Sequence, residues 1–109
     1  MGRMQQRKGK AFEKLVANLI GNALGEWLGR NPDQYDENAG RDLLTRLPFC
    51  IQCSHGKAIN VWRKLEEAHR SARPDELSVA ILRKDRHPII AVMEIGEWLQ
   101  LVAAALRNS

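Results

Sequence analysis

The stretch GRDLLTRLPFCIQCS, residues 40–54, contains two short apolar runs separated by the turn-like sequence TRLP. Apolar runs bounded by turn residues predict two strands, residues 42–46 and 49–54, joined as a hairpin. Side chains alternate between the two faces of a strand. In the second strand one row is Phe49, Ile51 and Cys53, and the other is Cys50, Gln52 and Ser54. We expect the first row in the core and interpret the second as a polar row.

The rest of the chain predicts helices and further strands around this hairpin. Apolar residues at spacings of three and four predict helices over residues 8–28, 58–73 and 95–107. Gly21 and Gly25 weaken the second half of the first helix, so its alternative end is near Leu24. Apolar runs predict strands over residues 76–84 and 88–93. The polar connection 29–41 is long enough to contain a short edge strand around Gln34 and Tyr35. The order α-β-β-α-β-β-α predicts an α/β fold, with a small central mixed sheet flanked by helices on both faces.

The apolar faces of the helices define the expected helical core. In the first helix Glu13 lies about 100° from Phe12, at the margin of the apolar stripe. The last helix is expected to point inward with Ile95, Trp98, Leu99, Val102 and Leu106. The inward face of the middle helix is expected to be Ala58, Val61, Trp62, Leu65, Ala68, His69 and Ala72. All three tryptophans, Trp27 included, lie on such faces and are predicted to be core residues.

Size and charge restrict the class of protein. A chain of 109 residues predicts one domain, and no apolar run approaches the ~18 residues that span a bilayer. We therefore expect a cytoplasmic or nucleoid-associated protein with no membrane partner. The net charge is +4, and residues 1–9 form a basic arm that phosphate would attract, or the start of a solvated helix. Cys50 and Cys53 form a lone CxxC, but they point in opposite directions along a strand, which argues against a zinc or redox site.

Two interpretations of the polar row remain open. In the structural one, Asp42 hydrogen-bonds a turn and Gln52 is a satisfied sheet residue. In the functional one, the row faces a cleft and holds a divalent cation. Mg²⁺ prefers oxygen ligands and usually takes few of them from the protein, so a carboxylate, an amide oxygen and a backbone carbonyl would suffice.

From Lys10 to about Leu101 the chain resembles the small phage-type members of the PD-(D/E)xK nuclease superfamily, similar to Holliday junction resolvases and VRR-NUC-type nucleases. The family pattern is a helical Glu, an Asp, and then Glu or Gln, one residue, and Lys on the next strand. Here KGKAFEKLV supplies Glu13, GRDLL supplies Asp42, and IQCS supplies Gln52. Ser54 stands in the place of the lysine. The segments NVWRKLEEA and EWLQLV also resemble these proteins.

The resemblance implies a restriction-endonuclease-like fold and a site at the sheet edge beside the first helix. It implies that Glu13, Asp42, Gln52 and the backbone carbonyl of Cys53 bind one or two Mg²⁺ or Mn²⁺ ions, which activate water for phosphodiester cleavage. Catalytic roles would fall to Asp42, Gln52 and Ser54, with Lys57 or Lys64 replacing the missing lysine. The residues expected to contact DNA are Arg7, Lys8, Lys10, Lys57 and Lys64.

The function expected from these residues is a metal-dependent DNA endonuclease of a bacterial host cell or its phage, acting on branched or duplex DNA. A homodimer is expected if it resolves junctions. The alternative is a catalytically impaired DNA-binding module on the same fold, because Ser54 carries no charge. A third interpretation is an oligomeric structural protein, which predicts neither metal binding nor salt-sensitive DNA affinity.

Overall fold

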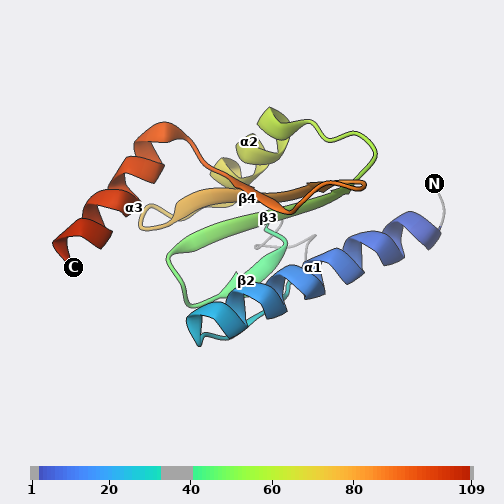
Figure 1. Cartoon of the computed structure of the whole chain (residues 1–109), viewed down its shortest axis with the longest axis horizontal. Helices are drawn as coiled ribbons and strands as arrows, with labels where there is room; N and C mark the ends of the chain where they lie inside the picture. Colours follow the sequence, from blue (N-terminus) through green and yellow to red (C-terminus); the bar gives the residue numbers. More distant parts are fainter. Residues whose placement is uncertain (1–2, 33–40, 109) are drawn as a thin grey trace.

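The computed structural model describes residues 3–32 and 41–108, with side chains from residue 9 onward (Figure 1). Within these ranges the chain forms an α/β fold of three helices and five strands, which confirms the predicted class. The elements in order are α1 (Arg3–Leu24), β1 (Leu28–Arg30), β2 (Leu43–Thr45), β3 (Phe49–Gly56), α2 (Val61–Ser71), β4 (Leu77–Lys84), β5 (Ile90–Val92) and α3 (Ile95–Arg107). The expected strand around Gln34 and Tyr35 lies outside the described residues.

The strands form two small sheets that meet at one edge. β3 and β4 are parallel and β5 is antiparallel to β4, whereas β1 and β2 form a separate antiparallel pair. The N–H of Asp42 donates to the carbonyl of Ile51 at 3.1 Å, which joins the start of β2 to the free edge of β3. The predicted hairpin is therefore wrong in its pairing. β2 makes its regular ladder with β1, a strand that the sequence did not predict, and it meets β3 only at its start, around Asp42.

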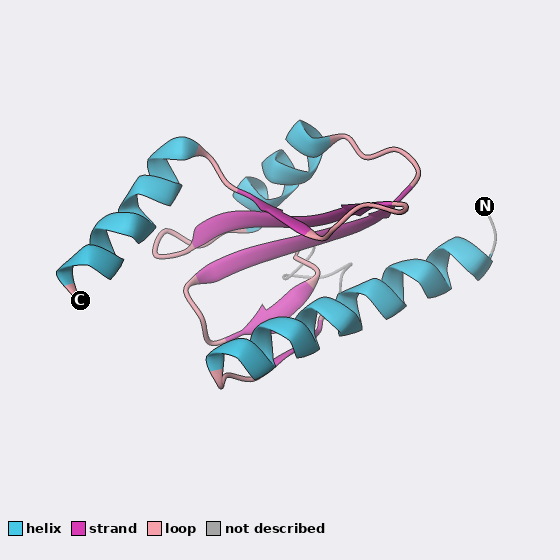
Figure 2. Ribbon diagram, in the orientation of Figure 1, coloured by secondary structure: helices cyan, strands magenta, loops and turns pink. Residues whose placement is uncertain are grey.

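The helices α1 and α2 cover opposite faces of the β3–β4 pair (Figure 2). α1 packs on β3 and β1 and contributes Phe12, Val16 and Ala17 to the main core. Ile51 and Cys53 of β3 belong to the same core, as predicted. α2 packs on β3 and β4 from the other side. The row that contains Gln52 is therefore buried beneath a helix rather than lining an open cleft, and Gln52 itself is only 2% exposed.

The first helix begins earlier than predicted and ends at the nearer of its two expected ends. It begins at Arg3, so the segment expected as a basic arm is helical from that residue, and it ends at Leu24, as the glycines at positions 21 and 25 predict. Gly25 stops the helix in a left-handed conformation, with φ of 67°, and its N–H bonds to the carbonyl of Gly21 at 2.8 Å. This is the usual geometry of a glycine-terminated helix. The chain is then free to turn back and form β1.

The predicted inward face of α3 is wrong, whereas that of the middle helix is confirmed in part. No residue of α3 is buried, and Ile95 and Leu106 are 68% and 70% exposed. α3 projects from one end of the sheet in Figure 1, because α1 and α2 already cover both faces of its long strands. Of the face predicted for the middle helix, Leu65 and Ala68 are buried and three more residues are half-buried: Val61, His69 and Ala72. The three tryptophans expected in the core are exposed as well: Trp27, Trp62 and Trp98.

Candidate active site at the edge of β3

Asp42 lies at the junction between the two sheets, immediately before β2. Its backbone is held from both sides, because its N–H bonds to Ile51 and its carbonyl accepts the N–H of Asn31 at 3.0 Å. Its side-chain Oδ2 accepts the backbone N–H of Cys53 at 2.7 Å. The carboxylate therefore sits against the edge of β3. Because the N–H and C=O of one strand residue point the same way, the carbonyl of Cys53 leaves the strand toward the same edge.

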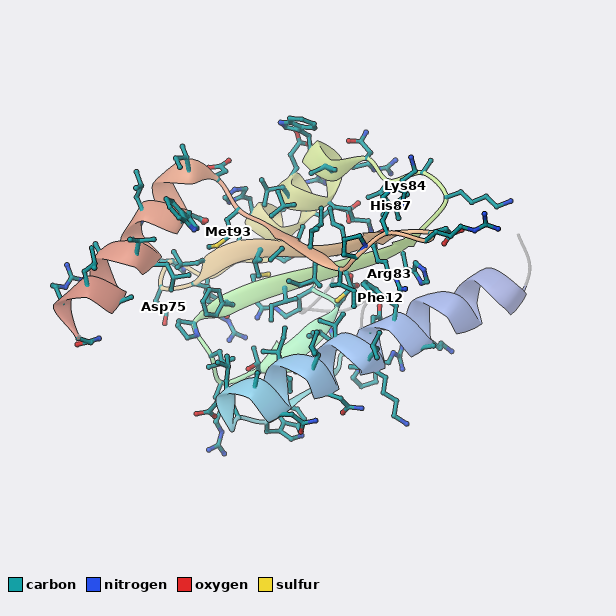
Figure 3. All side chains as sticks on the ribbon, viewed as in Figure 1. Phe12, Asp75, Arg83, Lys84, His87 and Met93 are labelled. Atoms are coloured by element: carbon teal, nitrogen blue, oxygen red, sulfur yellow. The ribbon has the colours of Figure 1, made fainter. Side chains whose placement is uncertain are left out.

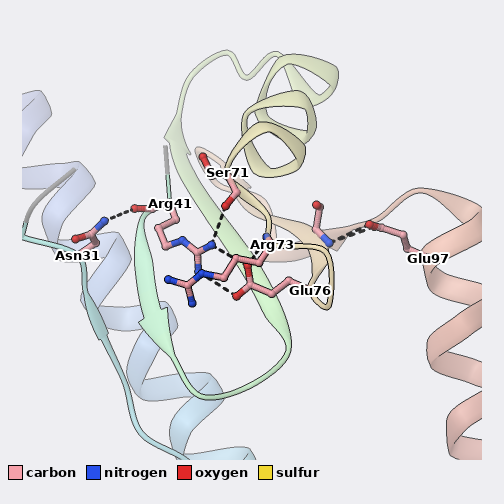
Figure 4. A network of polar contacts seen from close by, with 7 residues as sticks. Asn31, Arg41, Ser71, Arg73, Glu76 and Glu97 are labelled. Carbon is pink, nitrogen blue, oxygen red and sulfur yellow. Dashed lines mark hydrogen bonds and ion pairs between the residues drawn. The ribbon is translucent and has the colours of Figure 1, made fainter. Parts of the chain in front are cut away.

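A buried ion pair fixes the chain just before this aspartate (Figure 4). Arg41 makes two hydrogen bonds to Glu76, of 2.7 and 3.1 Å, and a third of 2.8 Å to the carbonyl of Ser71. Both charged side chains are less than one-tenth exposed. The amide of Asn31 donates to the carbonyl of Arg41 at 3.0 Å. A bidentate pair of this kind fixes both the position and the orientation of the arginine side chain. It therefore helps to hold the next residue, Asp42, at the edge of β3.

The electrostatic surroundings of Asp42 come from both helical layers. Burial raises the pKa of its carboxyl to about 6, and the Cys53 N–H opposes that rise. The negative charges of Glu13 and Glu67 also raise this pKa, whereas the positive charge of Lys64 lowers it. Glu13 belongs to α1, while Lys64 and Glu67 belong to α2. The edge of β3 is therefore where three acids and one lysine from distant segments act on one another.

Two of these acids are already engaged with cations. Oε1 of Glu13 accepts a hydrogen bond from Nε of Arg30 at 2.7 Å, and Glu13 is only 9% exposed. Nζ of Lys64 lies 3.2 Å from Oε2 of Glu67, one helical turn further along α2. The sequence analysis did not predict Arg30 or Glu67 as residues of the site. Glu67 could have been found as a neighbour of Lys64 on the helix, whereas the contact of Arg30 with Glu13 depends on β1.

The remaining predicted residues on β3 lie on the face beneath α2. Nε2 of Gln52 is buried and has no hydrogen-bond partner among the described residues. Ser54 is half-buried and lies opposite Leu82 in the parallel register. An unsatisfied buried amide N–H is costly, so Gln52 is a donor that a bound group could satisfy.

The predicted basic residues are dispersed. Lys64 alone contributes to the shifted pKa of Asp42, whereas Lys57 lines a separate cavity near the end of β4. Lys10 is exposed on α1. The side chains of Arg7 and Lys8 lie outside the described residues. Of the two candidates for the missing lysine, the geometry thus favours Lys64.

The cysteines are free thiols in a buried setting. Both are less than one-tenth exposed. Burial raises the pKa of the Cys50 thiol to about 11 and raises that of Cys53 further. Cys53 packs in the core beneath α1, whereas Cys50 lies near the charges of Arg41 and Glu76. Thiols in such surroundings are poor nucleophiles.

Within the described ranges, no three histidine, cysteine, aspartate or glutamate side chains converge as a metal-binding group. The same part of the chain holds no helix long and apolar enough to cross a membrane. Comparisons of the chain with protein-family models, with curated proteins and with solved structures find no match. The site is therefore interpreted from its own residues.

Proposed function

We propose that the protein is a metal-dependent DNA endonuclease whose site is the edge of β3. The observation that carries this proposal is the partly buried carboxyl of Asp42, which accepts the N–H of Cys53 and has its pKa raised to about 6. A carboxyl with a strongly shifted pKa, close to other acidic and basic side chains, is typical of functional sites. In this proposal the fold is restriction-endonuclease-like, and DNA would approach the site along the edge of β3.

The donor atoms suit Mg²⁺ or Mn²⁺ in part. The contact to Cys53 occupies Oδ2 of Asp42 and leaves Oδ1 as a ligand, and the carbonyl of Cys53 points to the same edge. A divalent ion there would offset the cost of burying the charged carboxylate, and it usually keeps several waters. Glu13 would have to exchange Arg30 for the metal. When bound, the ion would activate water and stabilise charge on the scissile phosphate.

Other side chains of the protein would stabilise charge on the phosphate and bind the DNA. Lys64 supplies the positive charge that Ser54 lacks, and its contact with Glu67 orients its ammonium group near Asp42. The buried Nε2 of Gln52 can donate to a phosphate oxygen or to a bound water. Exposed lysines such as Lys10 would bind the backbone of the DNA.

Cleavage of a labelled four-way junction and a matched duplex, in Mg²⁺, Mn²⁺ and EDTA, tests the proposal. We expect metal-dependent cutting that Asp42→Ala abolishes, and that Lys64→Met lowers about a hundredfold or more, the cost of losing one charge-stabilising group. Arg107→Met, which removes an exposed cation of α3, is the control and should leave the rate unchanged. Cutting in EDTA, or undiminished cutting by Asp42→Ala, would refute the proposal.

A second candidate is a DNA-binding module that no longer cleaves. The ion pair between Glu13 and Arg30 favours it, because the arginine already supplies the positive charge that a metal would bring. This candidate predicts salt-sensitive DNA binding that Mg²⁺ leaves unchanged, with no cutting of either substrate. The same assay, combined with a binding titration, separates the two.

A further inference from the structure

A cavity lies on the α2 side of the sheet, where the carboxyl ends of β3 and β4 meet the start of α2. Its volume is about 510 Å³. Cavities that take small organic ligands measure ~300–1,000 Å³. Its apolar wall includes Ile59, Val61, Leu82 and Ile90. We call it the α2–β5 cavity.

The rim of the α2–β5 cavity is positively charged. Lys57 and Lys84 line it, and neither forms an ion pair with a carboxylate among the described residues. No aspartate or glutamate of the described chain lines it. Nδ1 of His87, on the same rim, donates to the carbonyl of Asp85 at 2.9 Å, which leaves its other ring nitrogen for a ligand. Figure 3 places Lys84 and His87 at the same end of the sheet.

Backbone contacts hold the two loops of this rim together. The N–H of Asp85 bonds to the carbonyl of Gly56 at 2.9 Å, and the N–H of His87 bonds to that of Lys84 at 2.9 Å. Nε of Arg83 donates to the carbonyl of His87 at 3.0 Å. The backbone positions of the two lysines are therefore fixed before any ligand binds, which lowers the entropic cost of binding.

The α2–β5 cavity adjoins the candidate active site. Leu82 of its wall lies opposite Ser54 in the parallel register of β3 and β4. Val61, also in the wall, precedes Lys64 by three residues on α2, a rise of ~5 Å along the helix axis. A ligand that filled this cavity would therefore lie next to the residues near Asp42.

We propose that the α2–β5 cavity binds a nucleoside monophosphate unit, with the phosphate on Lys57 and Lys84 and the base against the apolar wall. A phosphate dianion offers three oxygens to two ammonium groups, a better match of charge and acceptors than one carboxylate. Inorganic phosphate alone would leave the apolar wall in water. The unit is either a free nucleotide or the unpaired end of a DNA strand; the second source rests on the proposed function.

Calorimetric titration of the full chain in EDTA tests this inference, with thymidine 5′-monophosphate, thymidine, inorganic phosphate and a 5′-phosphorylated tetranucleotide as probes. We expect the monophosphate to bind more tightly than thymidine or phosphate. Lys84→Ala should weaken it about tenfold, as expected for one charged hydrogen bond. Ile90→Trp, which fills the cavity from an exposed position of β5, should also weaken it, whereas Lys14→Ala should not.

The outcomes separate the two sources and the two proposals. Tighter binding of the tetranucleotide, sensitive to Lys84→Ala, would identify a strand end, and equal binding would identify a free nucleotide. Equal affinity for phosphate and monophosphate, or no effect of both Lys84→Ala and Ile90→Trp, would overturn the inference. Because binding is measured without metal, and is expected to persist in Asp42→Ala, a failed cleavage assay would leave it standing.

Discussion

Replacing Asp42 with asparagine should stabilise the fold at neutral pH in the absence of metal. Burial raises the pKa of this carboxyl from 3.8 to about 6 in the folded chain. A shift of about 2 pKa units corresponds to a cost of about 3 kcal/mol for holding the ionised group in the folded state. Asparagine has nearly the same shape, carries no charge, and its amide oxygen can still accept the N–H of Cys53.

The sign of the pH dependence follows from proton binding. Between about pH 4 and pH 6 the folded state holds a proton that the unfolded chain has lost, so the free energy of unfolding falls as the pH rises through this window. Below about pH 4 both states are protonated and the cost disappears. The advantage of Asp42→Asn should therefore be near zero at low pH and reach about 3 kcal/mol at pH 7 and above.

Urea unfolding in EDTA at a series of pH values measures this difference, with Asp75→Asn as the control because Asp75 is an exposed acid. Addition of Mg²⁺ should then stabilise the wild type and not Asp42→Asn, as expected when a ligand binds only the folded state. The variant could instead be no more stable than the wild type at neutral pH, or its advantage could be the same at every pH. Either result would show that folding does not raise the pKa of the Asp42 carboxyl.

Three other outcomes are expected. Glu76→Gln should lower the free energy of unfolding by about 3 kcal/mol, because it leaves its arginine partner buried without a counter-charge; a cost below about 1 kcal/mol in urea unfolding would show that this pair does not hold the chain. Cys50 and Cys53 should react with a thiol reagent only as the chain unfolds, because burial raises both pKa values; rapid labelling of the native protein would contradict their burial. Arg30→Met should tighten Mn²⁺ binding, measured by calorimetry, because it frees Glu13 from its ion pair; unchanged affinity would remove Glu13 from the ligand set.

The candidate site was predictable in its parts but not in its arrangement. The pattern of the first helix placed Glu13 at the margin of an apolar stripe, and the apolar runs placed Asp42 at the start of one strand and Gln52 within the next. These are local properties of the sequence, which follow from the periods of helices and strands. Gln52 proved to be buried under α2 rather than open to a cleft, because the sequence does not state how many faces of a strand are covered.

The contacts that position the site join residues far apart in the chain. Arg41 and Glu76 are separated by 35 residues, and Glu13 and Arg30 by 17. No local pattern pairs one charged residue with another at such a separation, and β1 is only three residues long, too short for a periodic signal. Their pairing became visible only once the strands had brought these segments together.

The sequence by itself determined the three helices, the strands other than β1, and that the fold is of the α/β class, since local periodicity and turn residues encode these features. Only the tertiary structure decided which apolar faces are covered. A stripe of apolar side chains on α3 shows which side of that helix avoids water, but burial also requires a free surface opposite it. α1 and α2 already occupy both faces of the central strands, so α3 and its Trp98 remain exposed.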